Sequence, residues 1–169
     1  MTRRAVVQKW ILYSLCALAL VLVQSLLLVR VQVWGVHPFL LPAIAVIPVT
    51  LERDEGALLF SVFFGLACDL LTPVAGLPCF YALAFLVSGG LAWLLSGRVV
   101  AAGLVCSLAA AASALVVCGV LHLAVLAGSQ SVDVTAAVVL AGKEAALSLP
   151  LTVLVHYPFR RICLLTQRD

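Results

Sequence analysis

The apolar segment near the amino terminus constrains the fold most strongly. Residues 10–29 contain no charged side chain, and Ser14, Gln24 and Ser25 are their only hydrophilic members. An α-helix needs about 20 apolar residues to cross about 30 Å of hydrocarbon, so this segment predicts a membrane-spanning helix. The apolar core of a cleaved signal peptide is shorter, roughly 7 to 15 residues, so we expect the helix to remain in the mature chain.

The remainder of the chain has the same character. Of its 169 residues, 65% are hydrophobic and 10% are charged, whereas an average soluble domain carries about 25% charged residues. Six helices of about 20 residues would use roughly 120 residues and leave only short connections. We therefore expect a single all-α membrane domain over residues 1–169. This composition excludes a large soluble catalytic domain and a secreted disulfide scaffold, and the net charge of +3 is too small for a nucleic-acid-binding surface.

Prolines, glycines and charged turns divide the chain into six predicted helices. These helices cover residues 10–29, 38–51, 57–71, 77–96, 99–127 and 133–157, the last ending before Pro158. Pro42 and Pro48 in the second helix leave backbone carbonyls that need partners from neighbouring helices in a membrane. We therefore expect the second helix to lie inside the bundle. The hydrophilic residues 52–56 that follow it are expected to form a solvated cytoplasmic turn rather than an acid/base or metal site.

Basic residues indicate the orientation, because cytoplasmic loops of membrane proteins are enriched in lysine and arginine. If the amino terminus is cytoplasmic, that side of the membrane carries eight basic residues outside the spans, and the other side carries only Arg30. The eight are Arg3, Arg4, Lys9, Arg53, Arg98, Arg160, Arg161 and Arg168. The sequence therefore predicts a multi-pass protein with both termini in the cytoplasm.

Small side chains recur at every fourth position on the later helices, a pattern that permits close helix contact in membranes. They are Ser61 and Gly65 in the third helix, Ala84, Ser88, Ala92 and Ser96 in the fourth, Ala102, Cys106, Ala110, Ala114 and Cys118 in the fifth, and Ala137, Ala141 and Ala145 in the sixth. We expect these faces to pack within the molecule; partner binding and chance composition are the alternatives. The first helix is mostly Leu and Val on every side, so we expect it to face lipid or a partner helix.

Several ionisable residues fall within the outer half of the predicted spans. Such residues cost a few kcal/mol in a membrane and usually face the protein interior with a partner. They are Asp69, Lys143 and Glu144, with His37 and His122 at similar depth. We expect an intramembrane polar cluster in which Asp69 or Glu144 neutralises Lys143 and so links the third and sixth helices. The alternatives are a polar cavity or proton path, and a sixth helix that starts at the interface with both charges in water.

No catalytic or metal-binding motif is present. The histidines have no metal-ligand spacing, and the six cysteines include no C-x-x-C pair. We expect the cysteines to be packing residues, with a disulfide between Cys68 and Cys79 as the lesser possibility. The sequence therefore predicts neither catalysis nor a bound cofactor.

A series of motifs resembles one bacterial family. H-P-F-L-L-P occupies residues 37–42, E-R-D-E-G occupies residues 52–56, and F-F-G-L-A-C-D-L-L-T-P-V-A-G-L occupies residues 63–77. The most specific positions in the last motif are Gly65, Asp69, Pro73 and Gly76. In these motifs, and in a predicted short sixth helix ending in paired arginines, the chain resembles the bacterial rod shape-determining protein MreD family.

The resemblance implies a non-catalytic scaffold in the bacterial inner membrane that takes part in cell elongation and peptidoglycan synthesis. It implies binding to MreC, a single-span protein with a periplasmic domain, beside MreB, RodA and penicillin-binding protein 2. It also implies a fold similar to the substrate-binding subunit of energy-coupling-factor vitamin transporters, and such a subunit is the alternative function. We expect the first helix to receive the partner.

Overall fold

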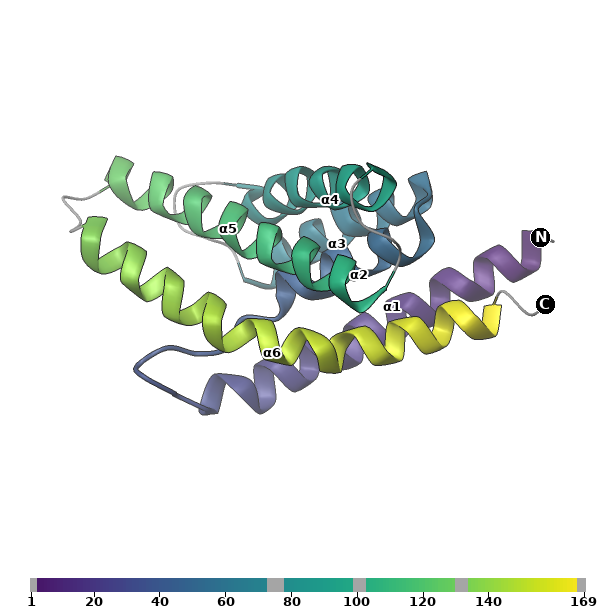
Figure 1. The fold of residues 1–169 in the computed structure, drawn as a ribbon, viewed down its shortest axis with the longest axis horizontal. Helices are drawn as coiled ribbons and strands as arrows, with labels where there is room; N and C mark the ends of the chain where they lie inside the picture. Colours follow the sequence, from purple (N-terminus) through teal and green to yellow (C-terminus); the bar gives the residue numbers. More distant parts are fainter. Residues whose placement is uncertain (1–2, 73–77, 99–102, 130–133, 167–169) are drawn as a thin grey trace.

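The computed structural model describes residues 3–72, 78–98, 103–129 and 134–166, and Figure 1 shows them as a bundle of helices. The helices are α1 (Arg3–Leu26), the 3-10 turn η1 (Leu28–Arg30), α2 (Leu41–Glu52), α3 (Glu55–Leu71), α4 (Phe80–Arg98), α5 (Leu104–Ser129) and α6 (Val134–Thr166). Among these described residues, three segments are long and apolar enough to cross a membrane: Val6–Arg30, Leu104–Val125 and Thr135–Thr166. The all-α fold class is confirmed, and the first, fifth and sixth predicted spans correspond to these segments.

The short helix α2 forms the centre of the bundle. Residues 42–50 are all buried, and α2 contacts α1, α3, α4, α5 and α6. Pro42 lies in the first turn, where a missing backbone N–H breaks no helical hydrogen bond, and Pro48 lies inside the helix. The prediction that the proline-containing second helix lies inside the bundle is confirmed.

Side chains of two other helices bind the backbone where the chain enters α2. The amide of Gln24, on α1, donates from Nε2 to the carbonyl oxygen of Pro38 at 2.8 Å and accepts from the N–H of Leu40 at 3.0 Å. The hydroxyl of Ser148, on α6, accepts from the N–H of Phe39 at 2.8 Å. These bonds supply partners that an apolar environment cannot, so they fix the start of α2 between α1 and α6.

The contact between α3 and α4 depends on Gly65. A Cβ atom at this position would lie 2.7 Å from both the Cα of Ala82 and the carbonyl oxygen of Tyr81. One turn earlier, the hydroxyl of Ser61 donates to the carbonyl oxygen of Phe85 at 3.1 Å. The two backbones therefore approach as closely as small residues allow, the arrangement that stabilises helix pairs in membranes.

Helix α6 extends beyond its predicted end. The sequence indicated an end before Pro158, whereas α6 runs to Thr166 with Pro150 and Pro158 inside it. Figure 1 shows a bend about midway along α6. Prolines inside a helix are a common cause of such bends, and Pro150 is the one at the middle of the α6 sequence. After Pro158, the buried ring of Phe159 stacks on Tyr13 of α1 with ring centroids 5.6 Å apart. This packing outweighs the loss of one backbone hydrogen bond, so the predicted short sixth helix is wrong.

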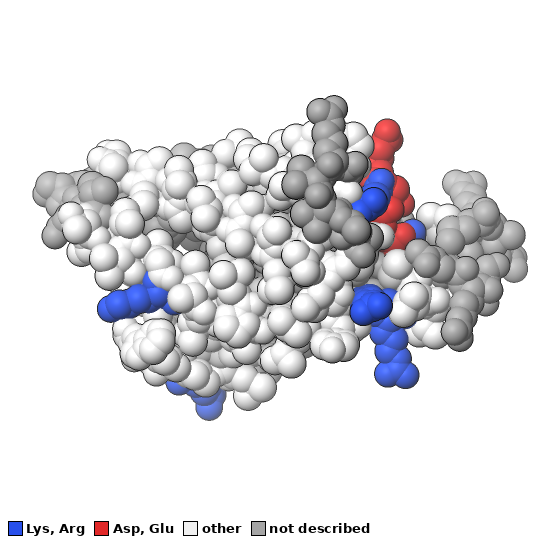
Figure 2. Space-filling model, viewed as in Figure 1, with Lys and Arg blue, Asp and Glu red and all other residues white. Residues whose placement is uncertain are grey.

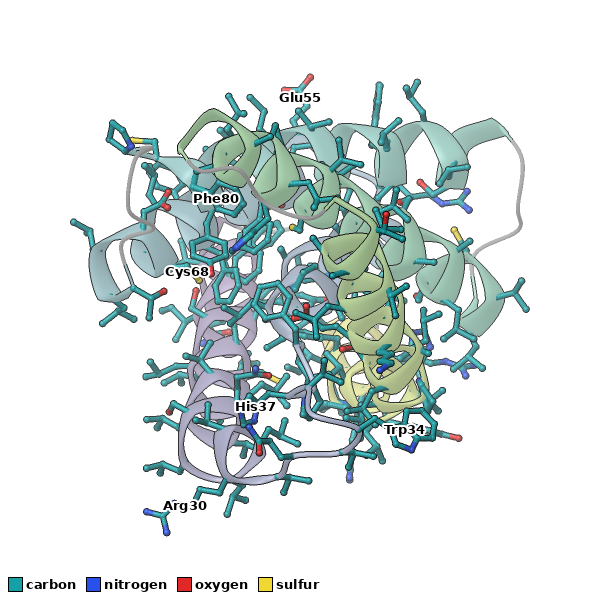
Figure 3. All side chains as sticks on the ribbon, turned by 90° about the vertical axis from the view of Figure 1, so that its left-hand side faces the viewer. Arg30, Trp34, His37, Glu55, Cys68 and Phe80 are labelled. Atoms are coloured by element: carbon teal, nitrogen blue, oxygen red, sulfur yellow. The ribbon has the colours of Figure 1, made fainter. Side chains whose placement is uncertain are left out.

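Helix α1 lies at the edge of the bundle, against α2 and α6. In Figure 1 the start of α1 and the end of α6 lie at the same end of the molecule, which we call the terminal end. The opposite end, which holds η1 and the start of α4, we call the distal end; Figure 3 looks onto it.

Helix α1 is mostly exposed. Only 11% of its most apolar stretch is buried inside the bundle, against 39% for α5. The first helix therefore leaves most of its apolar surface free for lipid or a partner.

Replacing Gly65 with alanine would push a methyl group into the backbone of α4. We expect Gly65→Ala to lose about 1–3 kcal/mol of stability, measured as a lower midpoint of thermal unfolding in detergent. Gly90→Ala is the matched control, because a Cβ atom there meets nothing within 4 Å and alanine favours helix over glycine. Equal stability of the two variants would show that α3 and α4 are not in close contact at Gly65.

Candidate functional site

Asp69 holds the start of α4. Its Oδ1 accepts a hydrogen bond from the N–H of Tyr81 at 2.8 Å, and its Oδ2 accepts from the N–H of Ala82 at 2.9 Å. Both amides belong to the first turn of α4, where backbone N–H groups have no partner within the helix. The carboxylate also complements the positive end of the helix dipole. Asp69 is thus an N-terminal cap supplied by the neighbouring helix α3.

The predicted ion pair of Lys143 with Asp69 or Glu144 is wrong. In the described part of the chain, the ion pairs within 4.0 Å join Lys9 to Glu52 and Lys9 to Asp54. Lys143 is exposed on α6, and Glu144 is half-buried. Consecutive residues of a helix point about 100° apart, so Lys143 lies on the outside of the bundle while Glu144 is turned toward its inside. The motif residues Pro73 and Gly76 lie outside the described residues.

Glu144 faces a cavity at the distal end. The cavity has a volume of about 230 Å³ and lies between the start of α4, the later part of α5 and the first half of α6. Its walls include Phe39, Phe80, Tyr81, His122, Ala141 and Glu144. His122 meets Phe80 edge to face, with ring centroids 6.0 Å apart. Figure 3 shows Phe80 and His37 at this end of the molecule.

The structure therefore gathers part of the predicted polar cluster. Glu144 and His122 line the same cavity, and His37 lies within electrostatic reach of Glu144. Asp69 reaches the same region only through its hydrogen bond to the backbone of Tyr81. Lys143 is the one residue of the predicted cluster that lies apart from the others. The arrangement is a partly polar cavity rather than an ion pair between helices.

A second polar group lies at the terminal end and involves Glu52. Lys9 Nζ lies 2.7 Å from Glu52 Oε2, and the hydroxyl of Tyr13 donates to Glu52 Oε1 at 2.8 Å. The side chains of Lys9 and Glu52 are only 6% and 9% exposed. The prediction of a solvated turn is therefore wrong for Glu52, although Arg53, the next residue, is exposed. Figure 2 shows acidic and basic side chains gathered toward this end.

The sequence contains a local signal for this group. Lys9 and Tyr13 are four residues apart, so they share one face of α1. The carboxylate of Asp54 caps α3 by accepting from the N–H of Ala57 at 2.8 Å, and it lies 3.9 Å from Lys9 Nζ. This face of α1 therefore offers the ammonium and hydroxyl groups that bind the acidic residues at the end of α2.

A third polar group joins α2, α5 and α6 in the interior. Thr50 Oγ1 donates to the carbonyl oxygen of Ile47 at 2.8 Å and lies 3.0 Å from Ser107 Oγ, which lies 2.9 Å from His156 Nδ1. Thr50, Ser107 and His156 thus form a continuous side-chain hydrogen-bond chain. His156 Nε2 is buried without a partner among the described residues. Ser107 and His156 are each 1% exposed, so substrate cannot reach this serine in the structure.

The small residues predicted for helix packing are mostly inside. Those completely buried are Ser61 of α3, Ala84, Ser88 and Ala92 of α4, and Cys106, Ala110 and Ala114 of α5. Ala102 lies outside the described residues. The six cysteines are free thiols, and Cys79 is exposed whereas Cys68 is buried.

The exposed side of α1 carries a shallow apolar groove at its terminal-end half. The groove is lined by Val6, Val7, Trp10, Ile11, Ser14, Leu15 and Leu18. Leu15 and Leu18 are 57% and 56% exposed. Large apolar side chains with this exposure indicate contact with lipid or another apolar helix.

Comparisons with known proteins give no match among protein-family models, curated proteins or solved structures. Across residues 3–72, 78–98, 103–129 and 134–166, no group of three or more His, Cys, Asp or Glu side chains is arranged to hold a metal ion.

Removing the positive partner of Glu52 should destabilise the terminal end. We expect Lys9→Met to cost about 3 kcal/mol, because it leaves a buried carboxylate without a counter-charge. The double variant Lys9→Met/Glu52→Gln should recover part of this loss, since glutamine can still accept from Tyr13 without a charge. A double-mutant cycle of thermal unfolding measures the coupling. Additive effects of the two single changes would show that the charges do not interact.

The distinct environments of Asp69 and Lys143 predict opposite outcomes on substitution. Asp69→Ala leaves two amides of α4 without an acceptor, so we expect a loss of about 2 kcal/mol. Lys143→Ala removes an exposed side chain and should change stability by less than about 0.5 kcal/mol. Thermal unfolding in detergent compares them. A loss for Lys143→Ala as large as that for Asp69→Ala would restore the ion-pair hypothesis.

Proposed function

We propose that the protein is a non-catalytic scaffold of the inner-membrane machinery for cell elongation, and that it binds an MreC-like single-span protein through α1. The observation that carries the proposal is the exposed apolar face of α1, at the edge of a bundle whose remaining helices pack around α2. Leu15 and Leu18 lie at the centre of this face. A transmembrane helix that buried them would gain close apolar contact.

The motifs that resemble the MreD family support this proposal through their structural roles. Gly65 permits the close approach of α3 to α4, and Asp69 caps α4 in the same interface. Both residues act in building the bundle rather than in bond chemistry. MreB, RodA and penicillin-binding protein 2 enter the proposal as further members of the machinery.

We infer six membrane crossings with both termini in the cytoplasm. The location of the α1 start and the α6 end at the same end of the molecule supports an even number of crossings. Counting about 20 residues back from Arg160 reaches Leu140, which places Lys143 within one turn of the outer boundary. There its flexible chain reaches the headgroups. Trp34, 71% exposed after η1, fits the same boundary, where tryptophan is enriched.

The shortness of α2 is compatible with this arrangement. Its 12 residues span about 18 Å, less than the hydrocarbon thickness. Because residues 42–50 are buried among the other helices, α2 needs no full-length contact with lipid. The backbone groups at its start are instead bound by Gln24 and Ser148.

A substrate-binding subunit of an energy-coupling-factor transporter is the second candidate, and the distal cavity is the observation that favours it. Pockets for drug-sized ligands are roughly 300–1,000 Å³, and this cavity of about 230 Å³ falls below that range. The cavity therefore suits a molecule smaller than most vitamins. This comparison favours the scaffold proposal.

Co-purification tests the scaffold proposal. Expressed with an MreC-like single-span protein and extracted in a mild detergent, the wild-type chain should retain the partner. Leu15→Ser should reduce the retained partner about tenfold, equivalent to about 1.4 kcal/mol, because the smaller side chain loses van der Waals contact with the partner helix. The matched control is Leu86→Ser on α4, since Leu15 and Leu86 are 57% and 53% exposed.

Three outcomes separate the candidates. Equal retention by both variants would contradict docking at α1. Failure of the wild-type chain to retain the partner would contradict the scaffold proposal itself. Recovery of an ATPase module together with a tightly bound small molecule would favour the transporter subunit.

A further inference from the structure

We propose that the distal cavity binds a small organic ammonium ion, with Glu144 as its counter-charge and aromatic rings as its walls. The site is built from α4, α5, α6 and the residues that precede α2. It lies away from the α1 groove, so the proposal does not depend on binding of MreC. Three properties of the cavity carry it: its charge, its walls and its size.

The charge of the cavity is negative. In the part of the chain that the structure describes, the Glu144 carboxylate has neither an ion-pair partner nor a hydrogen-bond donor; the hydroxyl of Ser148 binds the Glu144 backbone carbonyl instead. Lys143 is exposed and does not line the cavity. His37 is exposed, its Nε2 lies 3.2 Å from the amide of Gln32, and it is not among the residues that line the cavity. A half-buried carboxylate of this kind favours a cation.

The walls of the cavity favour an organic cation. Phe80 and Tyr81 meet edge to face with ring centroids 5.2 Å apart, and Phe39 lies 6.3 Å from Tyr81. Ring faces attract alkylated ammonium groups by cation–π interaction and also accept their apolar parts. A divalent metal ion would need several oxygen ligands, whereas Glu144 is the only carboxylate among the described lining residues.

The size of the cavity limits the ligand. About 230 Å³ accommodates a quaternary or primary ammonium group with a short chain. Two sources carry this chemistry: a free amine and the ammonium headgroup of a lipid. The second source depends on the proposed membrane orientation, in which the distal end lies at the outer interface.

Calorimetric titration of the full-length protein with choline tests the site. We expect saturable binding of choline, and no saturable binding of 3,3-dimethylbutan-1-ol, which has the same shape without the charge. Glu144→Gln should weaken choline binding at least about tenfold, equivalent to about 1.4 kcal/mol, and Phe80→Leu should weaken it through loss of a ring. Lys143→Gln is the matched control, because it removes the neighbouring charge outside the cavity and should leave the affinity unchanged.

The same titration in nanodiscs distinguishes the two sources. Weaker choline binding in phosphatidylethanolamine than in phosphatidylglycerol nanodiscs would identify a lipid ammonium group as the competing occupant, and equal binding would identify a free amine. The proposal is overturned if choline does not bind, if the neutral alcohol binds equally well, or if Glu144→Gln, shown folded by thermal unfolding, binds choline like the wild-type protein. None of these results bears on retention of an MreC-like partner.

Discussion

The satisfaction of backbone polar groups inside an apolar bundle is the constraint on which the structure depends. The central helix α2 is too short and too proline-rich to be stable by itself, and side chains from other helices bind its two ends. Gln24 and Ser148 bind the backbone at its start, and Lys9 and Tyr13 bind Glu52 at its end. α1 and α6 are therefore attached to the bundle by polar contacts at the ends of α2 as well as by apolar packing.

The features that could be predicted from sequence are those that the membrane imposes on each segment separately. Apolar length predicted helices, and the prolines of the second helix predicted an interior position. Ser61 and Gly65 predicted a close-packing face on α3, and the structure shows that α4 fills it. Each of these follows from local composition. A single sequence is sufficient for them because no information about a distant partner is required.

The partners of individual polar groups could not be predicted in this way. Depth along a helix placed Asp69 near Lys143, but direction around the helix decides contact, and Asp69 binds the start of α4 instead. The end of α6 was missed for a related reason, since stacking of Phe159 on Tyr13 continues the helix past Pro158. Both errors concern long-range contacts, whose energy outweighs the local preference.

Helix α6 connects the two surfaces that the proposals use. Its last part packs Phe159 against α1, beside the exposed groove, and its first half places Glu144 in the distal cavity. The bend about midway along α6 lies between them. Because Glu144 has no partner among the described residues whereas Glu52 has two, the distal carboxylate contributes little to holding the helices together. A half-buried carboxylate without a partner is costly in an apolar bundle, and the proposed ammonium ligand would supply its counter-charge.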